Sequence, residues 1–157
     1  MSKGAKNKLR DWPLIDRPGF LARRMHQIHV SLFHEHCTDF GLTPLQYSLL
    51  SVLSGLDETD QTTLANLVAL DRTTTTGGLK RLESRGLIRR QTSPSDRRAQ
   101  TCAISKKGRD LLDAMETAVR RAHTETVQSL SAEEQKKLLE LLHRIIASHD
   151  ERRAKVS

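Results

Sequence analysis

Hydrophobic residues recur at helical spacing along most of the 157-residue chain. Near the start they form a narrow stripe, typical of a helix packed against another helix, which predicts a first long helix over residues 18–39. The stripe consists of Leu21, Met25, Ile28 and Leu32. The next segment, residues 45–56, is apolar on most sides and should be central. Thr43, Pro44 and Gln46 predict its start, since they supply a cap, a first-turn proline and a capping-box partner.

The pattern changes in the middle of the chain. Two short helical patterns, residues 63–70 and 73–85, follow one another, and Gly86 stands where the second would end. Two β-prone runs, residues 87–88 and 101–104, then flank a segment in which Pro94 suits the second position of a turn. Helix, turn, helix and hairpin in this order predict a winged helix-turn-helix.

Two further helices are predicted after the hairpin. Ser105 can cap a helix that runs to about residue 129, and Ser131 with Glu134 forms a capping box for the last helix. The last helix carries an apolar stripe, which is seldom left in water. The stripe consists of Leu138, Leu139, Leu141, Leu142, Ile145 and Ile146. Because so short a chain has little core to cover these helices, we expect a homodimer; packing within one chain is the alternative.

The predicted fold class is mainly α with a small β-hairpin wing, in a single domain over residues 1–157. Residues 43–104 would form the winged helix-turn-helix, and residues 17–40 and 105–152 a helical dimerisation region. Residues 1–12 contain four basic side chains and little apolar content, which indicates a mobile basic arm. Aromatic residues make up only 3% of the chain, consistent with a helical protein that buries further surface against a partner.

Positive charge is concentrated in the winged segment. Residues 72–109 contain 11 lysines and arginines and only two acidic residues, a local balance of +9. The whole chain carries +7, so all the other residues together sum to −2. A charge run is usually only a solvated face. Charge that segregates this sharply onto a predicted docking element favours binding to the phosphates of nucleic acid.

The same segment resembles the MarR family of bacterial transcription regulators. The matching positions are Leu64-Ala65, residues 70–74, the leucines and glycine of residues 79–88, Asp96-Arg97-Arg98, and Ser105 to Gly108. An Asp-Arg-Arg wing tip followed by this helix start is more specific than a helix-turn-helix alone. The resemblance implies a dimeric repressor of a pseudo-palindromic duplex DNA operator, whose ligand weakens DNA binding.

The predicted recognition helix begins with four threonines and two glycines. This is a poor helix sequence, since an interior glycine costs about 1 kcal/mol relative to alanine. A frayed turn is the alternative, but residues at this position face base edges, where threonine can contact bases or phosphates. The predicted DNA-binding residues are Arg72, Thr73, Thr74, Thr76, Gly77, Lys80, Arg81, Asp96, Arg97 and Arg98. Thr73 is equally suited to be the helix cap.

For the wing, the resemblance implies that Arg98 enters the minor groove, whose negative potential attracts arginine where A·T pairs narrow it. Asp96 would orient an arginine through a bidentate ion pair, and Arg97 would contact phosphates. A solvent-exposed turn is the alternative, but it leaves the aspartate unexplained.

Residues 16–29 resemble the regulators of aromatic-acid breakdown within this family, such as those for nicotinate or hydroxycinnamates. A carboxylate effector needs a cation or an imidazole donor in a mostly apolar cleft. The candidate effector-binding residues are Arg23, Arg24, His26, His29 and Tyr47, although each histidine alone could be an ordinary core or surface residue. The first guess is a hydroxylated nicotinate. An aromatic acyl-CoA effector, or a DNA-binding protein with no effector, are the alternatives.

Other function classes lack their signatures. The sequence shows no paired nucleophile and base, no Gly-rich phosphate loop and no metal motif, so we expect no enzyme, cofactor or metal site. A metal site built from His26, His29, His34 and His36 is conceivable, yet no carboxylate-cysteine pattern completes it. Peroxide sensors of the MarR family have a reactive cysteine near the start of the first helix, whereas Cys37 lies near its end, so the resemblance argues against thiol sensing. Cys37 and Cys102 should both be buried thiols. No apolar run could span a bilayer, so a cytoplasmic protein without membrane contact is expected.

Overall fold

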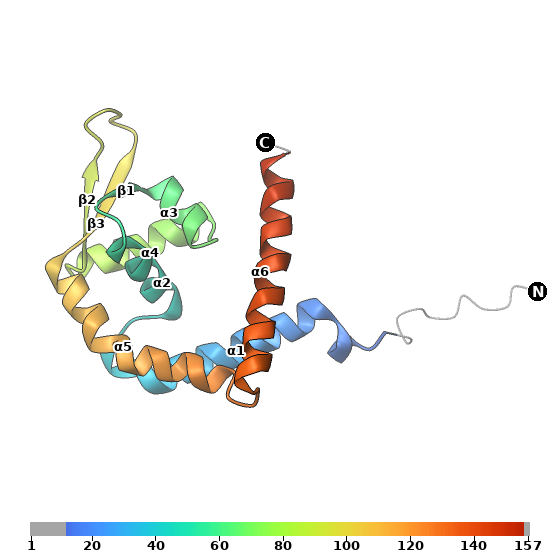
Figure 1. Ribbon diagram of the computed structural model, residues 1–157. Coiled ribbons are helices and arrows are strands. Elements are labelled where there is room, and N and C mark those ends of the chain that lie inside the picture. The colour runs from blue at the N-terminus through green and yellow to red at the C-terminus, as the bar shows by residue number, and fades with distance from the viewer. Residues whose placement is uncertain (1–11, 156–157) are drawn as a thin grey trace, which may run out of the picture.

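The computed structural model describes residues 12–155, so the expected basic arm lies outside the described residues except for Trp12. The described chain is mainly helical with a small antiparallel sheet (Figure 1). Its helical elements are η1 (Leu14–Asp16), α1 (Pro18–Cys37), η2 (Thr38–Phe40), α2 (Pro44–Ser54), α3 (Gln61–Leu67), α4 (Arg72–Ser84), α5 (Lys106–Thr126) and α6 (Ala132–Ala154). Its strands are β1 (Thr59–Asp60), β2 (Ile88–Thr92) and β3 (Gln100–Ile104).

The core lies where α2 and α4 meet the sheet and α5. Leu49, Leu50 and Leu53 of α2 and Leu79 and Leu82 of α4 have no exposed surface. Each such leucine contributes about 1.5–3 kcal/mol relative to an exposed position. The central place predicted for the second long apolar segment is confirmed, and the winged part of the fold has its own packed interior.

The wing is a longer hairpin than the sequence indicated, and a third strand joins it. β2 continues to Thr92, which lies opposite Gln100 of β3, while Ile88 lies opposite Ile104. β1 pairs with the other edge of β3, so the strand order is β1-β3-β2. A two-residue strand carries no alternation of apolar and polar positions, and the sequence therefore gave no signal for β1.

Aspartates rather than threonines begin the two short helices. The carboxylates of Asp60 and Asp71 accept hydrogen bonds from the amides of Thr63 and Thr74, each at 2.8 Å. As a result α3 begins two residues earlier than predicted and α4 one residue earlier, and Thr73 is not the cap. Aspartate is among the strongest N-cap residues, which explains the preference. The caps predicted at Thr43, Ser105 and Ser131 are confirmed.

The connection between α4 and β2 is fastened to the start of α5. The Ser105 hydroxyl donates to the carbonyl of Gly86 at 2.7 Å, and its amide donates to the carbonyl of Leu87 at 3.0 Å. A Cβ at position 108 would overlap that Leu87 oxygen, so Gly108 is required for the close approach. The wing, the end of α4 and the first turn of α5 therefore form one packed junction.

α1 and α5 pack side by side beneath the winged part. Phe33 and Cys37 of α1 are buried with Met115, Val119 and Ala122 of α5. The outer half of α1 projects beyond this contact (Figure 1). Within residues 12–155, no helix is long and apolar enough to cross a membrane.

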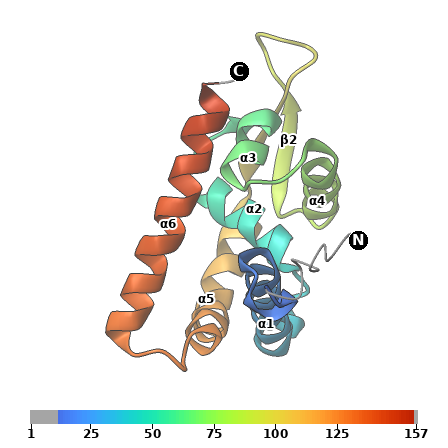
Figure 2. The same cartoon turned by 90° about the vertical axis from the view of Figure 1, so that its right-hand side faces the viewer.

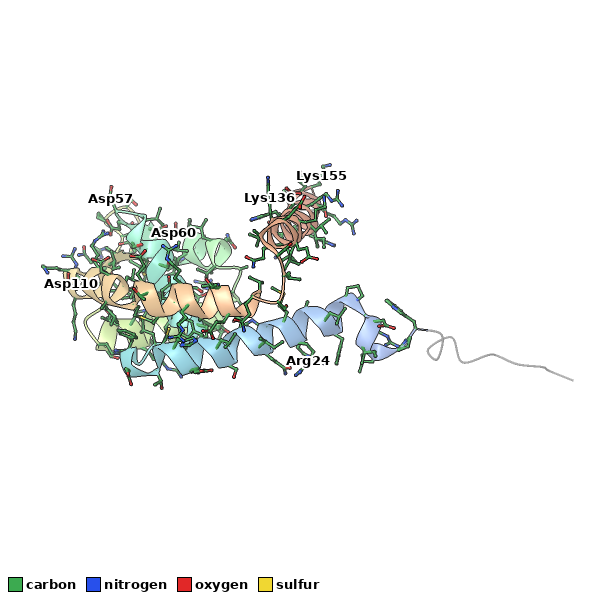
Figure 3. The ribbon with its side chains drawn as sticks, turned by 60° about the horizontal axis from the view of Figure 1, so that its bottom comes forward. Arg24, Asp57, Asp60, Asp110, Lys136 and Lys155 are labelled. Carbon is green, nitrogen blue, oxygen red and sulfur yellow. The ribbon has the colours of Figure 1, made fainter. Side chains whose placement is uncertain are left out.

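α6 stands apart from the rest of the molecule. Figure 2 shows it on the opposite side from α4, and Figure 3 shows it separated from the bodies of α1 and α5. None of its residues is buried, and Leu139, Ile145 and Ile146 are each more than half exposed. The apolar stripe predicted for the last helix exists, but the single chain does not cover it.

Candidate nucleic-acid interface and effector cavity

One face of α4 is open to solvent and carries most of the predicted docking residues. Arg72, Thr73, Thr76, Gly77 and Lys80 line a single shallow depression along this face. A Cβ at position 77 would meet no atom within 4 Å, so the glycine leaves backbone accessible in the middle of the depression. Two basic side chains, two hydroxyl-bearing side chains and open backbone suit the groove of a nucleic acid.

The accessible threonine hydroxyls in the first turns of α4 differ in what they can still bind. Thr74 donates its hydroxyl proton to the Asp71 carboxylate at 2.5 Å, and Thr76 donates its proton to the Arg72 carbonyl at 2.8 Å. These two oxygens can therefore only accept hydrogen bonds, which suits amino groups of bases rather than phosphates. Among the described residues Thr73 makes no such bond, so it alone of the three can donate to a phosphate.

The inward face of α4 gives the second reason for its poor helix sequence. A Cβ at Gly78 would lie 2.7 Å from Leu49 Cδ1 and 2.9 Å from Leu45 Cδ2, so glycine lets α4 approach α2 closely. Thr75 is buried and donates its hydroxyl to the Asp71 carbonyl at 2.9 Å. The two glycines thus have different roles, one in packing and one on the open face.

The wing turn differs from the expected arrangement. Oδ1 of Asp96 accepts a hydrogen bond from the backbone amide of Arg98 at 2.9 Å, and the Ala99 amide donates to the Asp96 carbonyl at 3.0 Å. The expected ion pair with an arginine is not formed, because an aspartate two residues before an amide closes a local turn instead. Arg97 and Arg98 remain exposed. Arg98 also lines a small cavity with Arg72, so the wing and the start of α4 adjoin.

Not all of the basic charge of residues 72–109 faces outward. Arg85 donates to the carbonyls of Gly41 and Phe40 at 2.6 and 3.0 Å, and Arg90 pairs with Glu83 at 2.7 Å. Five of the basic side chains bind the protein itself: Arg85, Arg90, Lys106, Lys107 and Arg109. Within residues 12–155, the other basic side chains of this segment form no hydrogen bond or ion pair: Arg72, Lys80, Arg81, Arg89, Arg97 and Arg98. The local charge of +9 therefore overstates the charge available for phosphates.

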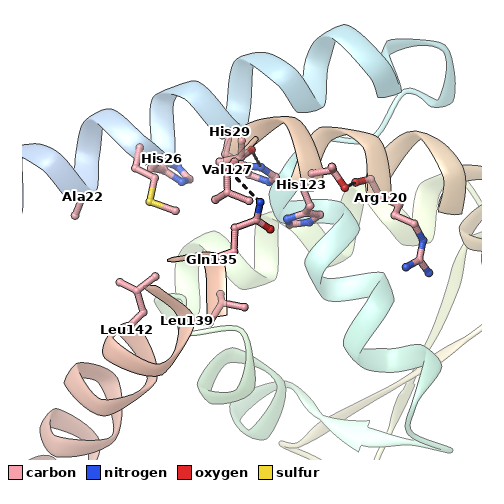
Figure 4. Close-up of a pocket in the computed structure, with 12 residues that line it drawn as sticks. Ala22, His26, His29, Arg120, His123, Val127, Gln135, Leu139 and Leu142 are labelled. Atoms are coloured by element: carbon pink, nitrogen blue, oxygen red, sulfur yellow. Dashed lines mark hydrogen bonds between the residues drawn. The ribbon is translucent and has the colours of Figure 1, made fainter. Parts of the chain in front are cut away.

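Two cavities meet at three histidines on the other side of the fold. His26 and His29 of α1 and His123 of α5 line both cavities. The first, called the α6-side cavity, has a volume of about 690 Å³ and is bounded by Leu139 and Leu142 of α6 (Figure 4).

The second, called the α2-side cavity, has a volume of about 490 Å³. Phe33 and Tyr47 line it, and their rings lie 5.7 Å apart. Val68 and Leu70 of the turn before α4 also line it. Between them Ala69 adopts a left-handed conformation, with φ of 54°, which costs an L-residue about 1–2 kcal/mol. The cavity thus borders the segment that leads into the recognition helix.

Of the three histidines, His29 is the one whose ring is positioned by a hydrogen bond within the described residues. Its Nδ1 lies 3.0 Å from the Thr126 hydroxyl, and its ring lies 4.4 Å from that of His123 at a tilt of 31°. Burial, followed by the neighbouring charges of His123 and His26, lowers the pKa of His29 below its usual value. The ring is therefore uncharged at neutral pH.

The structure brings together three of the five predicted effector residues. His26, His29 and Tyr47 line the α2-side cavity, whereas Arg23 and Arg24 line neither cavity. Arg24 lies on the side of α1 away from α6 (Figure 3) and donates to Gln27 at 3.1 Å. Arg23 lies over the ring of Phe20 instead. Arg24 is two positions from His26 and therefore faces another direction, whereas Arg23 is three positions away and is kept from the cavities by its contact with Phe20.

Some residues of the cavities come from the later helices and were not predicted from the sequence. His123 lies in both cavities, and Arg120 and Gln135 line the α6-side cavity. Arg120 and His123 are one turn apart on α5, which indicates a shared face. Which face of α5 meets α1 follows only from the packing of the two helices.

The remaining histidines and the two thiols do not gather into a metal-binding group in the described part of the chain. No group of residues there could hold a metal ion. His36 binds Glu125 of α5 at 2.9 Å, across the same seam as His29. Cys37 and Cys102 are free and buried, and burial raises the pKa of Cys102 to about 11. Buried thiols of this kind are unreactive.

Comparison with known proteins agrees with this arrangement. Residues 42–99 match the model of the MarR family. The HTH-type transcriptional repressor NicR of Pseudomonas putida is 30% identical over 139 residues, which are 88% of each chain.

Two solved structures are similar over nearly the whole fold. One is BpsR of Bordetella bronchiseptica, from a study of the regulation of its DNA binding by 6-hydroxynicotinic acid. It has a TM-score of 0.80 and 26% identity, over 85% of this chain and 96% of that one. The other is the transcriptional repressor CouR bound to a 23-mer DNA duplex, with a TM-score of 0.76 and 27% identity, over 92% and 99% of the chains. The winged helix-turn-helix fold and these relatives show that the chain belongs to the MarR family of transcriptional regulators.

Proposed function

We propose that the protein is a sequence-specific, homodimeric repressor that a small aromatic carboxylate releases from a pseudo-palindromic DNA operator. The observation that carries the proposal is the open face of α4, with its unpaired basic side chains, next to the exposed arginines of the wing. NicR is named as a repressor, and CouR was solved on a DNA duplex, which supports the same role here.

For docking, α4 enters the major groove with its first turns toward the bases. Thr74 and Thr76 accept hydrogen bonds from base amino groups, while Thr73, Lys80 and Arg81 contact phosphates. Arg98 reaches into the adjacent minor groove and Arg97 binds the backbone beside it. In a two-fold dimer the two copies of α4 read half-sites about one helical turn apart.

The dimer is proposed from the uncovered apolar surface. α6 leaves large apolar side chains in solvent, and Leu21 and Ile28 on α1 are about half exposed as well. A second copy that covers both helices would remove this surface from water and set the separation of the two recognition helices. Residues 17–40 and 105–152 are accordingly proposed as the dimerisation region.

The α2-side cavity is the proposed effector site. It offers imidazoles from His26, His29 and His123 and the hydroxyl of Tyr47 within a mainly apolar lining. Because Val68 and Leu70 form part of its wall, a ligand there contacts the turn that precedes α4. The relation of BpsR to 6-hydroxynicotinic acid supports an aromatic acid, and a hydroxylated nicotinate is the first candidate.

The DNA-binding part is tested with matched charge variants. Arg98→Ala should weaken operator binding by about 1–3 kcal/mol and reduce discrimination at the base pairs beneath the wing. Lys106→Ala removes the same charge, but Lys106 pairs with Asp110 at 2.7 Å within α5, so operator binding should barely change. Fluorescence anisotropy with an operator duplex and a scrambled duplex measures both. Equal affinity of the wild type for the two duplexes would refute specific regulation.

The effector part is tested by titrating 6-hydroxynicotinate into the protein–operator complex. Release should follow binding measured by calorimetry, with operator affinity reduced roughly 5- to 150-fold at saturation, as for typical allosteric coupling. If an aromatic acyl-CoA released the operator and free acids did not, the effector would be an acyl-CoA and not a free carboxylate. If 6-hydroxynicotinate bound without releasing the operator, the cavity would bind a ligand but would not regulate DNA binding.

A further inference from the structure

The hydroxyl of Thr126 fixes which nitrogen of His29 carries a proton. Oγ1 of Thr126 lies 2.8 Å from the carbonyl oxygen of Ala122 and 3.0 Å from Nδ1 of His29. A hydroxyl has one proton and a carbonyl has none, so the proton of Thr126 must lie on the bond to Ala122. Nδ1 of His29 is then the donor in its own bond to Thr126.

A neutral imidazole carries one proton, so Nε2 of His29 has a free lone pair. Nε2 has no hydrogen-bond partner within residues 12–155. No side-chain nitrogen or oxygen in that range is both buried and unpaired, so Nε2 is accessible. Because Nδ1 faces Thr126, which lines the α6-side cavity, Nε2 lies on the other side of the ring. The lowered pKa of His29 keeps the ring neutral at pH 7 and preserves this lone pair.

We propose that His29 acts as an obligate hydrogen-bond acceptor in the effector cavity, where it selects aromatic acids that carry an O–H or ring N–H donor besides their carboxylate. The inference rests on the effector site proposed above. It adds that His29 accepts, and does not donate, a hydrogen bond in that site. A carboxylate or an ether oxygen at Nε2 would meet a second lone pair, whereas a phenol or a pyridone N–H would form a hydrogen bond.

The carboxylate of such a ligand is bound elsewhere in the same cavity. His26 and His123 form no hydrogen bond within residues 12–155, so either ring is free to present an N–H. The hydroxyl of Tyr47 is a further donor. The three histidines therefore have different roles: His29 accepts a hydrogen bond from the ligand, and His26 and His123 donate hydrogen bonds to its carboxylate. Thr126 is a positioning residue, since it sets the polarity of His29 from outside the α2-side cavity.

The proton position is measured directly, without a ligand. Two-dimensional ¹⁵N–¹H correlation of the imidazole rings at pH 7 should show a protonated Nδ1 and an unprotonated Nε2 for His29, assigned by comparison with His29→Gln. Thr126→Val should lose this fixed pattern. Thr124→Val is the matched control, because the Thr124 hydroxyl also donates to a carbonyl one turn earlier, that of Arg120 at 2.9 Å. A proton on Nε2 in the wild type would overturn the proposal.

Selection is measured by calorimetry with two ligand series: 4-hydroxybenzoate, 4-methoxybenzoate and benzoate, and 6-hydroxynicotinate with nicotinate. Wild type and Thr124→Val should prefer the hydroxylated acid by roughly tenfold or more, as for a site whose polar group is left unpaired by the wrong ligand. In Thr126→Val the His29 ring can present Nε2–H. The ratio of the affinities for 4-hydroxybenzoate and 4-methoxybenzoate should therefore fall toward one. A merely structural role of Thr126 would weaken all the acids alike.

The outcomes separate this inference from the function on which it rests. Equal binding of hydroxylated and methoxylated acids by the wild type overturns the role of His29 but leaves an effector cavity. Failure of every acid in both series to bind overturns the aromatic-acid effector itself, and the selection with it.

Discussion

The block built from α2 and α4 and the isolated helix α6 are both rich in leucine, yet they differ completely in burial. Leu49, Leu79 and Leu82 have no exposed surface, whereas Leu139 and Ile145 are each more than half exposed. The winged block is therefore stabilised within one chain. The apolar stripe of α6 has the composition of a core without a covering partner, and its stability must come from another molecule.

The largest expected effect comes from the core of the winged block. Leu79→Ala should lower the free energy of unfolding by about 2–5 kcal/mol, because a buried leucine leaves a cavity that the neighbours fill only in part. Urea denaturation at two protein concentrations tenfold apart measures the change. The loss should be the same at both concentrations if the block folds within one chain, and a loss below about 1 kcal/mol would contradict its close packing.

A charge on the apolar stripe of α6 should act through assembly. In one chain Ile145→Glu alters an exposed position, but in a dimer it removes up to about 1.5–3 kcal/mol of burial per protomer and adds a charge. Analytical ultracentrifugation should show monomers where the wild type is dimeric, and the melting temperature should no longer rise with protein concentration.

Ala147→Glu is the control for this variant. Position 147 is exposed and lies about 200° around the helix from position 145, so it adds the same charge on the opposite side of α6. This variant should remain dimeric. If Ile145→Glu also sediments as the wild type does, the uncovered stripe is not the dimer interface.

The smallest expected effect is a pH dependence at the seam between α1 and α5. Burial and the charges of His123 and His26 lower the pKa of His29 in the fold, so the unfolded chain binds its proton more readily. Stability from this group should therefore be lost as pH falls below about 6.5, the ordinary value, through the lower value in the fold. Melting temperatures measured from pH 7.5 to about 5 should fall less steeply for His29→Gln.

His149, exposed near the end of α6, supplies the comparison for this measurement. His149→Gln should keep the pH dependence of the wild type, since that side chain lies outside the α1–α5 seam. Equal slopes for His29→Gln and the wild type would show that another group causes the acid sensitivity.

The parts of the fold that sequence could predict depend on neighbours along the chain. The caps at Thr43, Ser105 and Ser131 each act on an amide three residues later, and all three are where the pattern placed them. The sequence did not distinguish Asp71 from Thr73 as the cap of α4, because two cap-forming residues two positions apart give the same signal. The two-residue β1 depends wholly on pairing with β3 and left no pattern of its own.

The parts of the site that could not be predicted depend on contacts between distant segments. Arg85 looks like a DNA-facing cation, but its guanidinium binds the carbonyls of Phe40 and Gly41, more than 40 positions earlier. His123 meets His29 only because α5 lies along α1 with that face inward. Charge and spacing select residue types correctly, whereas the packing of helices decides which of them face the ligand.

The junction at Gly108 makes α5 a rigid connection between the winged block and the cavities. Its first turn is locked to the end of α4 and the wing by Ser105, and its last turn carries His123 and Thr126 at the cavities. A helix of 21 residues is about 30 Å long. A tilt of about 5° about one end moves the other by roughly 2–3 Å, an appreciable fraction of the ~12 Å width of a major groove. In the proposed function, a ligand that displaces the histidine end of α5 by this amount would shift α4 relative to the groove that it is proposed to enter.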